Sequence, residues 1–466
     1  MSYGLGTAFG LAKETSYGTP VSPALWVPFV SQSMEGSAPL VTQGTIMADR
    51  SVYRNLPQPR SGAGDVTFEV DGSNQGMPLY LANGNASGGY AAAAIPGRIS
   101  SAPTVSVNSG GTIPVGTYRI RVASVWQRAD LAGSGEPGEF YYLPVSAELQ
   151  ATATSGNQTF ALSFTDPTTL TPPLGFTYYG TAIYISAAGG GSNTEKFLAF
   201  VVGTDATYSH TGSATGANGA SGTMVATMYQ HTYTRAYTAG QNPVPGFTTT
   251  ILQDNDVSEQ YMGCRSNGID FTWNNGDAPL MSKMAVMARD YREVANPTPS
   301  VPDIIKMMSW QATVAVDGTF DERIEGLQLA IANNCELLPG LSGQRRRRDV
   351  GFGTRMVTGS LSRDFADHTF WRKLRASESF GIRCTTVGGP ISATAGSIPL
   401  DGSKIAYPIP YFMTAEVFGC KAEKAGATTS NAGRLVETVP FKTEVDSSTG
   451  TECRIRVYNL TSDYAA

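Results

Sequence analysis

Four consecutive arginines, Arg345, Arg346, Arg347 and Arg348, are the sharpest concentration of charge in the sequence. Guanidinium groups form charge-assisted hydrogen bonds with phosphates and carboxylates, so a run of this kind suggests contact with nucleic acid. A charge run is also typical of a solvated loop, and Asp349 partly offsets this one. Both interpretations stay open at this point.

Three carboxylates lie close together at Asp254, Asp256 and Glu259. Carboxylate oxygens are the ligands that Ca²⁺ prefers, but this stretch lacks the loop glycine and the number of ligands of a known calcium motif. A solvated acidic loop is the favoured interpretation, and we predict no metal site here.

Other residues that could do chemistry are sparse. The segments 4–6 and 351–353 read Gly-x-Gly, yet neither has the flanking strand and helix of a dinucleotide turn or the Gly-Lys-Ser/Thr ending of a phosphate loop. The three histidines, His210, His231 and His368, lie in separate segments, which disfavours a histidine-based metal site or triad. The sequence therefore predicts no catalytic residues, no cofactor and no metal, and the protein is expected not to be an enzyme.

The five cysteines are widely spaced, odd in number and never in Cys-x-x-Cys spacing, at Cys264, Cys335, Cys384, Cys420 and Cys453. This pattern indicates reduced, mostly buried thiols rather than a disulfide framework or a zinc site. The N-terminus shows no basic segment followed by an apolar run, and no apolar stretch reaches 18 residues. We expect synthesis in a reducing cytoplasm, without membrane insertion.

Composition favours a β-rich structural protein. The 466 residues include 52 Gly and 27 Pro, which indicates many turns, while charged residues make up only 15%, against about 25% in ordinary proteins. The hydrophobic content of 41% is enough for several cores in two to four domains. A net charge of −5 excludes a strongly basic nucleic-acid binder.

The elements that carry these residues occur twice. In the first copy, Gly62 and Gly64 lead into a strand-like run at 65–70 and a helix-like segment at 77–84. In the second, Gly351 and Gly353 lead into 356–361 and a helix-like segment at 365–374. When Val66 is set against Val357, Thr67 meets Thr358 and Val70 meets Leu361 without a gap. Two copies of one module are typical of a protein that forms a surface or a ring.

Shifts in composition predict the domain boundaries. The segment 97–225 is poor in charge, leaves through a flexible Gly/Ser/Ala-rich stretch, and contains alternating runs spaced as in a β-sandwich. It interrupts the first module, which comprises 1–96 and 226–296. The Pro-rich segment 297–302 forms a linker, and the second module spans 303–466. Within it, Asp317-Gly318 predicts a hairpin. The expected fold class is mainly β, with two tandem modules of one short helix each and an inserted sandwich.

Several stretches resemble the tail tube, or major tail, proteins of bacteriophages with long non-contractile tails. The similarity rests on the order of 12–20, 26–28, 54–84, 261–271, 316–318, 327–334, 357–360 and 458–460. Segments 116–122, 135–139 and 182–185 of the insertion resemble immunoglobulin or fibronectin type III modules. Relatives often carry such a module at the C-terminus, so a place inside the first copy is a departure.

The resemblance implies self-assembly. Sheets of neighbouring modules join into a ring, three chains supply six quasi-equivalent positions, and stacked rings form the conduit through which DNA is ejected into the host. The genome crosses a polar, neutral to acidic bore without specific binding. The implied partners are the tape measure, terminator and tip proteins of the tail, with no membrane. The implied location is the virion tail, assembled in the cytoplasm of the bacterial host.

A third interpretation of the four arginines follows from the resemblance, and it is the one we favour. Loops between tube strands face the next ring, so Arg345, Arg346, Arg347 and Arg348 could meet Asp254, Asp256 or Glu259 of that ring and set the register. Two other functions stay open. The chain could be a capsid decoration or adhesion protein that binds carbohydrate through its immunoglobulin-like domain, or a carbohydrate-active enzyme, for which no converging carboxylates are evident.

Overall fold

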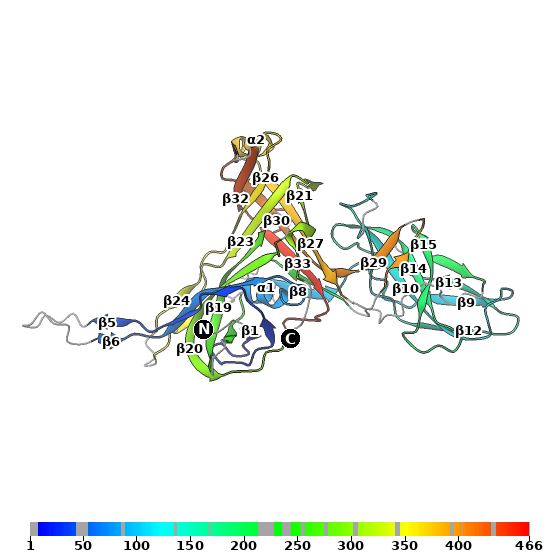
Figure 1. Ribbon diagram of the computed structural model, residues 1–466, viewed down its shortest axis with the longest axis horizontal. Coiled ribbons are helices and arrows are strands. Elements are labelled where there is room, and N and C mark those ends of the chain that lie inside the picture. Colours follow the sequence, from blue (N-terminus) through cyan, green and yellow to red (C-terminus); the bar gives the residue numbers. More distant parts are fainter. Residues whose placement is uncertain are drawn as a thin grey trace, which may run out of the picture.

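The structure is a computed structural model (Figure 1). It describes residues 8–42, 55–84, 89–134, 138–166, 169–212, 228–234, 244–252, 257–274, 278–301, 306–340, 345–391, 396–402, 404–429 and 435–465. The fold is mainly β, as predicted, and the described residues contain two α-helices. Neither helix is long and apolar enough to cross a membrane.

Both copies of the repeated design place an eight-residue helix after a nine-residue strand. In the first copy β7 (Ser61–Glu69) precedes α1 (Gly76–Asn83), close to the predicted segment 77–84. In the second, β26 (Met356–Asp364) precedes α2 (Thr369–Ala376). The predicted start of this helix at 365 was wrong, because the Phe365 N–H donates to the Leu435 carbonyl and Asp367 accepts from the Thr369 N–H where the helix begins.

One continuous run of strands passes through both copies. Its members pair in the order β3 (Ser31–Gln32) and β4 (Glu35–Ser37), β7, β20 (Met281–Ala295), β19 (Val257–Trp273), β23 (Ile324–Ala332), β26, β32 (Leu435–Thr443) and the end of β30 (Pro410–Ala422). We call this run the shared sheet. The first copy supplies the strands up to β19, and the second supplies those from β23 onward.

The two copies meet where residues 268–273 of β19 pair antiparallel with residues 327–332 of β23. We call this pairing the internal joint. Phe271 faces Leu329 across it, and each side chain is 1% exposed. The joint is therefore part of the hydrophobic core and not a loose contact between domains.

The other strands of the two copies extend the same sheet around this core. They are β1 (Ala8–Lys13), β2 (Leu25–Val27), β8 (Tyr90–Ala94), β17 (Tyr229–Tyr233), β18 (Phe247–Leu252), β21 (Ala312–Val316), β22 (Thr319–Phe320), β27 (Phe380–Pro390), β31 (Ala427–Thr429) and β33 (Cys453–Asn459). The C-terminal strand β33 pairs with β17 of the first copy and with β30 of the second, so the chain end ties the copies together. β21 and β22 form the hairpin predicted at Asp317-Gly318.

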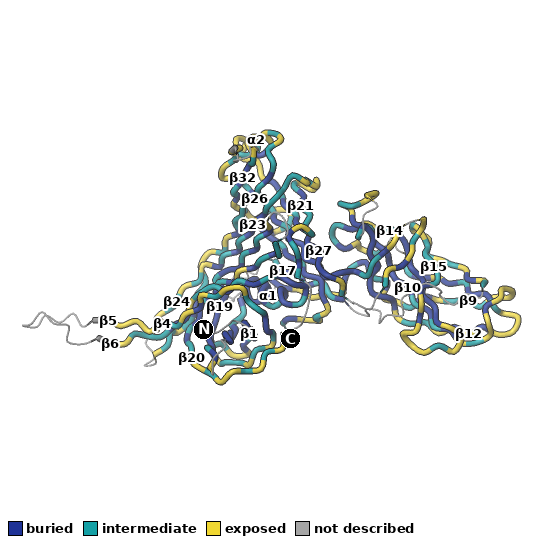
Figure 2. The backbone as a smooth tube through the Cα atoms, viewed as in Figure 1, coloured by how far each residue is buried: buried dark blue, intermediate teal, exposed yellow. Residues whose placement is uncertain are grey.

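Each copy also contains a two-stranded antiparallel arm. The first arm is β5 (Leu40–Thr42) with β6 (Asn55–Pro57), and it extends away from the body at the left of Figure 1. The second arm is β24 (Glu336–Leu338) with β25 (Asp349–Gly351), and it packs against β19 and β20 of the first copy. Leu40, Val41 and Leu56 of the first arm are exposed (Figure 2).

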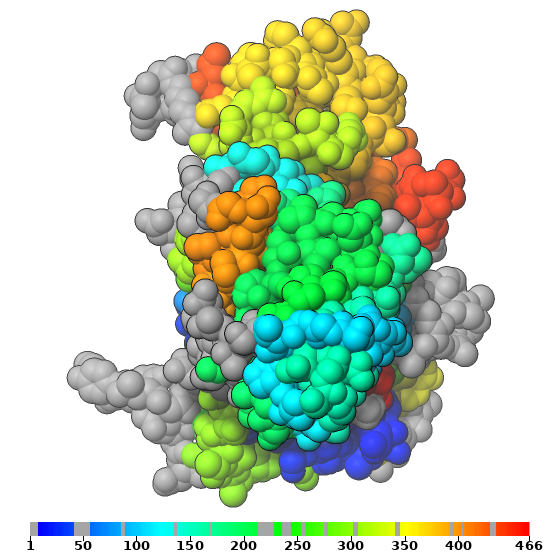
Figure 3. Space-filling model, turned by 90° about the vertical axis from the view of Figure 1, so that its right-hand side faces the viewer, coloured from blue at the N-terminus to red at the C-terminus, as the bar shows by residue number. Residues whose placement is uncertain are grey.

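The segment between 97 and 212 forms two sheets over a common apolar cluster that includes Tyr118, Phe160 and Ile183. The larger sheet contains β10 (Gly116–Arg128), β11 (Phe140–Tyr142), β12 (Leu149–Ala153), β14 (Phe176–Ile185) and β15 (Lys196–Val202). The smaller contains β9 (Thr104–Asn108), β13 (Thr159–Ser163) and β16 (Thr207–His210). The lobe projects to the right in Figure 1 and faces the viewer in Figure 3.

Strand pairing and a shared apolar cluster connect this lobe to the second copy. β28 (Ile398–Pro399) pairs with β29 (Ile405–Pro408), which adds a parallel strand to β11. Trp126 and Phe176 of the lobe share a cluster with Phe412 and Tyr458. Strands from beyond residue 303 thus help to hold the inserted segment.

Beyond β20, which ends at Ala295, residues 297–301 form neither helix nor strand. The 3-10 helix at Ser309–Gln311 leads into β21.

Candidate functional site: the polar face of the shared sheet

Alternation along the strands gives the shared sheet one apolar and one polar face. Val66, Met284, Ile269, Leu329 and Val357 point into the core, and each is at most 3% exposed. Their neighbours in sequence point to the other face. Together with Lys442, which follows the buried Phe441, five of those neighbours form a row across six strands. Each residue of the row lies opposite the next: Thr67, Lys283, Asp270, Ala330, Thr358 and Lys442.

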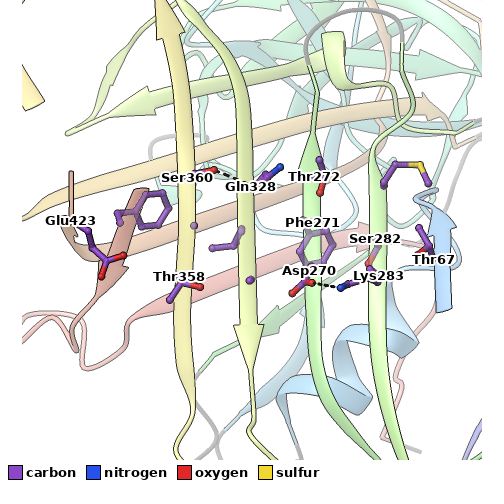
Figure 4. A pocket seen from close by; sticks show the side chains of 15 residues that line it. Thr67, Asp270, Phe271, Thr272, Ser282, Lys283, Gln328, Thr358, Ser360 and Glu423 are labelled. Atoms are coloured by element: carbon purple, nitrogen blue, oxygen red, sulfur yellow. Dashed lines mark hydrogen bonds and ion pairs between the residues drawn. The ribbon is translucent and has the colours of Figure 1, made fainter. Parts of the chain in front are cut away.

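The polar face is hollowed into an open depression of about 600 Å³. Figure 4 shows its lining, with Asp270 and Lys283 directed toward each other and Thr67, Gln328, Thr358 and Ser360 beside them. Such a wide, shallow hollow with hydroxyl, amide and paired charged groups does not enclose a small molecule. It is an open part of the polar face, lined by groups that can form hydrogen bonds with water.

In the first copy, Lys283 stands between two carboxylates. Its ammonium nitrogen lies 3.3 Å from Asp270 and 3.6 Å from Asp65. Partial burial lowers the pKa of Lys283, but attraction to Asp270 and Asp65 outweighs this and the pKa is raised. Burial raises the pKa of the Asp270 carboxyl, and Lys283 opposes that shift. The positive charge is therefore matched by negative charge beside it.

The second copy repeats this arrangement with other residues. Lys442 pairs with Glu423, and Lys421 lies 2.8 Å from Glu444. All three lysines of this face, Lys283, Lys421 and Lys442, thus have a carboxylate partner. None of these three ammonium groups is therefore unpaired.

The arginine run 345–348 lies where the second arm meets the first copy. The Arg60 N–H donates to the Arg345 carbonyl, and the Arg289 side chain donates to the Arg347 carbonyl at 2.9 Å. The backbone is therefore held within the chain. Arg345 and Arg348 have exposed side chains, whereas those of Arg346 and Arg347 are half-buried.

Aromatic stacking reinforces this docking of the second arm. The Arg265 guanidinium lies 4.4 Å from the Tyr17 ring and 4.9 Å from the Phe352 ring. Phe352 follows β25, and Tyr17 belongs to the first copy, where its hydroxyl accepts from the Val350 N–H. Gly351 and Phe352 thus serve an arm contact, and the second Gly-x-Gly segment has this structural role.

The predicted acidic group is described only in part. Asp254 and Asp256 lie outside the described residues. Glu259 lies near the start of β19 and accepts a hydrogen bond from the Tyr261 hydroxyl at 2.6 Å. The structure thus places Glu259 on the first copy, and its expected contact with the arginines stays a prediction.

Sequence reasoning missed the polar row and a buried ion cluster. Arg363, at the end of β26, is 3% exposed and lies 3.0 Å from Glu437, 3.3 Å from Asp321 and 3.2 Å from Asp367. The row has no local signal in 281–295, because Ser282 and Lys283 are adjacent polar residues and 284–288 are all apolar. Only Asp367 is local, four residues after Arg363, whereas Asp321 and Glu437 come from distant segments and give no sequence signal.

The described residues thus give one sheet shared by the two copies, with a polar face that opens into a wide hollow. The profile of the family described as phage tail tube protein matches residues 4–442. The chain belongs to this family. No curated protein matches the sequence. The tail tube family is structural, which agrees with the predicted role as a phage tail component rather than an enzyme.

Proposed function

We propose that this tail tube protein polymerises into stacked rings that form the conduit for DNA ejection from a long non-contractile tail. The observation that carries the proposal is the shared sheet, in which two modules already join through a fully paired internal joint. A third and further modules can be added in the same way until the sheet closes, which removes its exposed edges.

Three chains supply six modules, so the ring is a trimer with pseudo-sixfold symmetry. The polar face of the shared sheet lines the bore. Lys283, Lys421 and Lys442 of this face each have a carboxylate partner, which weakens their hold on DNA phosphates and suits passage without specific binding. The tube ends contact the other tail proteins (tape measure, terminator and tip), and assembly takes place in the host cytoplasm.

The lobe at 97–212, expected to be an immunoglobulin-like module, points outward from the tube. It projects from the body well away from β7, β20 and β19 (Figure 1), where it does not interrupt closure of the ring. Arg345 and Arg348, which are exposed beside the second arm, face the next ring and meet acidic residues there.

Negative-stain microscopy of the purified protein tests this function. The expected result is rings or tubes that lengthen with protein concentration. A protein that stays monomeric at all concentrations and binds carbohydrate would instead support a decoration or adhesion role.

A further inference from the structure

The two ends of the shared sheet are unlike each other and complementary. At the first end, among the described residues, β3 and β4 pair with β7 alone. At the other end, β30 pairs with β27 only up to Cys420. Residues 421–424 come after that point, and one edge of this segment pairs with β32. Among the described residues, neither end has a strand paired along its outer edge.

The internal joint gives the template for joining these ends. Thr67 pairs with Ser31 on one side and with Lys283 on the other. Its equivalent in the second copy, Thr358, pairs with Ala330 and with Lys442. Ser31 is therefore the equivalent of Ala330, and Lys283 is the equivalent of Lys442.

The next step leads to the far end. In the strand register, Lys283 lies opposite Asp270 of β19, and Lys442 lies opposite Lys421 of β30. Asp270 and Lys421 are therefore equivalent positions. Across the internal joint Asp270 faces Ala330. Their equivalents, Lys421 and Ser31, lie at opposite ends of one chain and can face each other only when they belong to two copies.

Building on the proposed tube function, we propose that residues 28–33 of one copy pair antiparallel with residues 419–424 of the next, with Ser31 opposite Lys421 and Val30 opposite Ala422. The partner is a second copy of this chain, and the contact repeats the register of the internal joint. Each module then contributes four strands to a closed sheet.

Burial supports this register. Leu329 is 1% exposed because Phe271 packs beside it across the internal joint. Val30, its equivalent at the free end, points to the same apolar face and is 60% exposed. Ala422, the equivalent of Phe271, is half-buried against the main core. The proposed pairing covers Val30 with Ala422 and extends the core from one copy into the next.

Charge also fits this register. Ser31 places a small hydroxyl opposite Lys421 on the polar face, as Ala330 places a methyl group opposite Asp270. Lys421 keeps its carboxylate partner Glu444, so the new pairing buries no unpaired ammonium group. Side chains of this size leave the two backbones free to approach to hydrogen-bonding distance.

The test uses paired cysteines in the full chain. Facing residues of antiparallel strands have Cα atoms about 4.5–5.5 Å apart, within the range of a disulfide. Ser31→Cys combined with Lys421→Cys should, after oxidation of assembled tubes, convert single chains into covalent dimers and closed trimers on non-reducing gels. Asp270→Cys with Ala330→Cys is the matched positive control, because it should close a bond inside one chain without changing the chain number.

Val30→Cys with Lys421→Cys is the register control. These two side chains point to opposite faces and should not cross-link. Tubes that form normally but yield no covalent dimer from the Ser31/Lys421 pair overturn the inference and leave the tube function intact. Wild-type protein that forms no tubes overturns the tube function itself.

If the Ser31→Cys/Lys421→Cys variant fails to fold, a second variant tests the proposed pairing. Val30→Asp places a charge at a site that is exposed in the single chain, so the thermal midpoint of the subunit should stay unchanged while rings are lost. Val202→Asp, at a similarly exposed valine (48%) of the outer lobe, is the control and should leave rings intact. Rings that persist with Val30→Asp contradict the inference.

Discussion

Arg363 shows how much a single side chain contributes to the second copy. Its guanidinium is almost fully buried, bonds to Glu437, Asp321 and Asp367, and lies over the Phe370 ring of α2. Removal of one partner of a buried ion pair leaves the other charge without compensation. The cluster therefore holds α2 against the strands that carry it.

We predict that Arg363→Met lowers the free energy of unfolding by about 3–5 kcal/mol. Arg323→Met is the control, since Arg323 bonds to the same Asp321 but is 37% exposed and should cost at most about 1 kcal/mol. Urea denaturation of both variants measures the difference. If both variants lost the same free energy of unfolding, burial of Arg363 would not be the cause of the loss.

Acid should weaken the same cluster. Hydrogen bonds from Thr369, and then from Arg363, hold the pKa of Asp367 below its ordinary value of 3.8. A lowered pKa stabilises the folded state above the unfolded value, and the gain is lost as the pH falls through the folded value. Asp367→Asn keeps the acceptor for the Thr369 N–H but removes the charge. Its melting temperature should lie below that of the wild type near neutral pH. The gap should begin to narrow below about pH 4 and close only as the pH approaches the lowered pKa of the folded state.

At the scale of elements, the charge balance of the polar face depends on ion pairs between neighbouring strands. Lys283 of β20 is matched by Asp65 of β7 and Asp270 of β19. In the proposed tube each ring repeats this group, so a free cation at this place would act on DNA many times along the bore.

We predict that Asp65→Asn with Asp270→Asn leaves tubes intact but makes them retain DNA, because Lys283 becomes an unpaired ammonium group. The measurement is binding of duplex DNA to purified tubes as a function of salt, where retention should fall steeply as salt rises. The additional change Lys283→Gln should restore free passage. Tubes that bind no more DNA than the wild type would show that the face does not line the bore.

The arginine loop belongs to the same scale. Its backbone is fixed by Arg60 and Arg289, so the exposed Arg345 and Arg348 side chains can be changed without loss of the arm contact. Arg345→Ser with Arg348→Ser should leave rings intact but shorten the tubes at low salt, where each exposed ion pair contributes about 0.2–1 kcal/mol. The difference from the wild type should shrink as salt rises, because salt screens the ion pairs of the wild type. Tube length by microscopy checks this. Normal length at every salt concentration would leave the loop as a solvated turn.

The sequence closely predicted the strand that precedes the helix in each copy, and the first helix, because glycines and alternation mark them locally. It did not predict that β19 and β20 run for 17 and 15 residues or that β19 pairs with β23. Pairing of distant strands leaves no local pattern. The second helix begins four residues later than predicted, because the Phe365 N–H donates to the Leu435 carbonyl and not to a helical partner.

The candidate site was predictable only in part. The arginine run stands out in the sequence by its charge. It lies beside the second arm, in the segment that precedes the repeated strand of the second copy. The polar row could not be found, because Lys283 and Asp270 are ordinary residues until register places them opposite each other. The same holds for β29, whose pairing with β11 joins segments far apart in the sequence.

At the scale of the whole molecule, the body and the outer lobe have different roles in the proposed assembly. The body carries the shared sheet, both arms and both helices, while the lobe at 97–212 projects to one side (Figure 1). The second copy supplies β28 and β29 to that lobe, so its attachment is fixed by strand pairing and by the cluster around Trp126 and Phe412. A fixed lobe would give the tube a regular outer surface.

The central claim is that two joined modules make each chain a third of a ring. Cryo-electron microscopy of purified tubes tests it most directly, because it counts chains per ring and resolves the pairing between them. The account predicts three chains per ring, six similar modules around the bore and the polar face turned inward. A ring of six chains, or a bore lined by any other face, would contradict it.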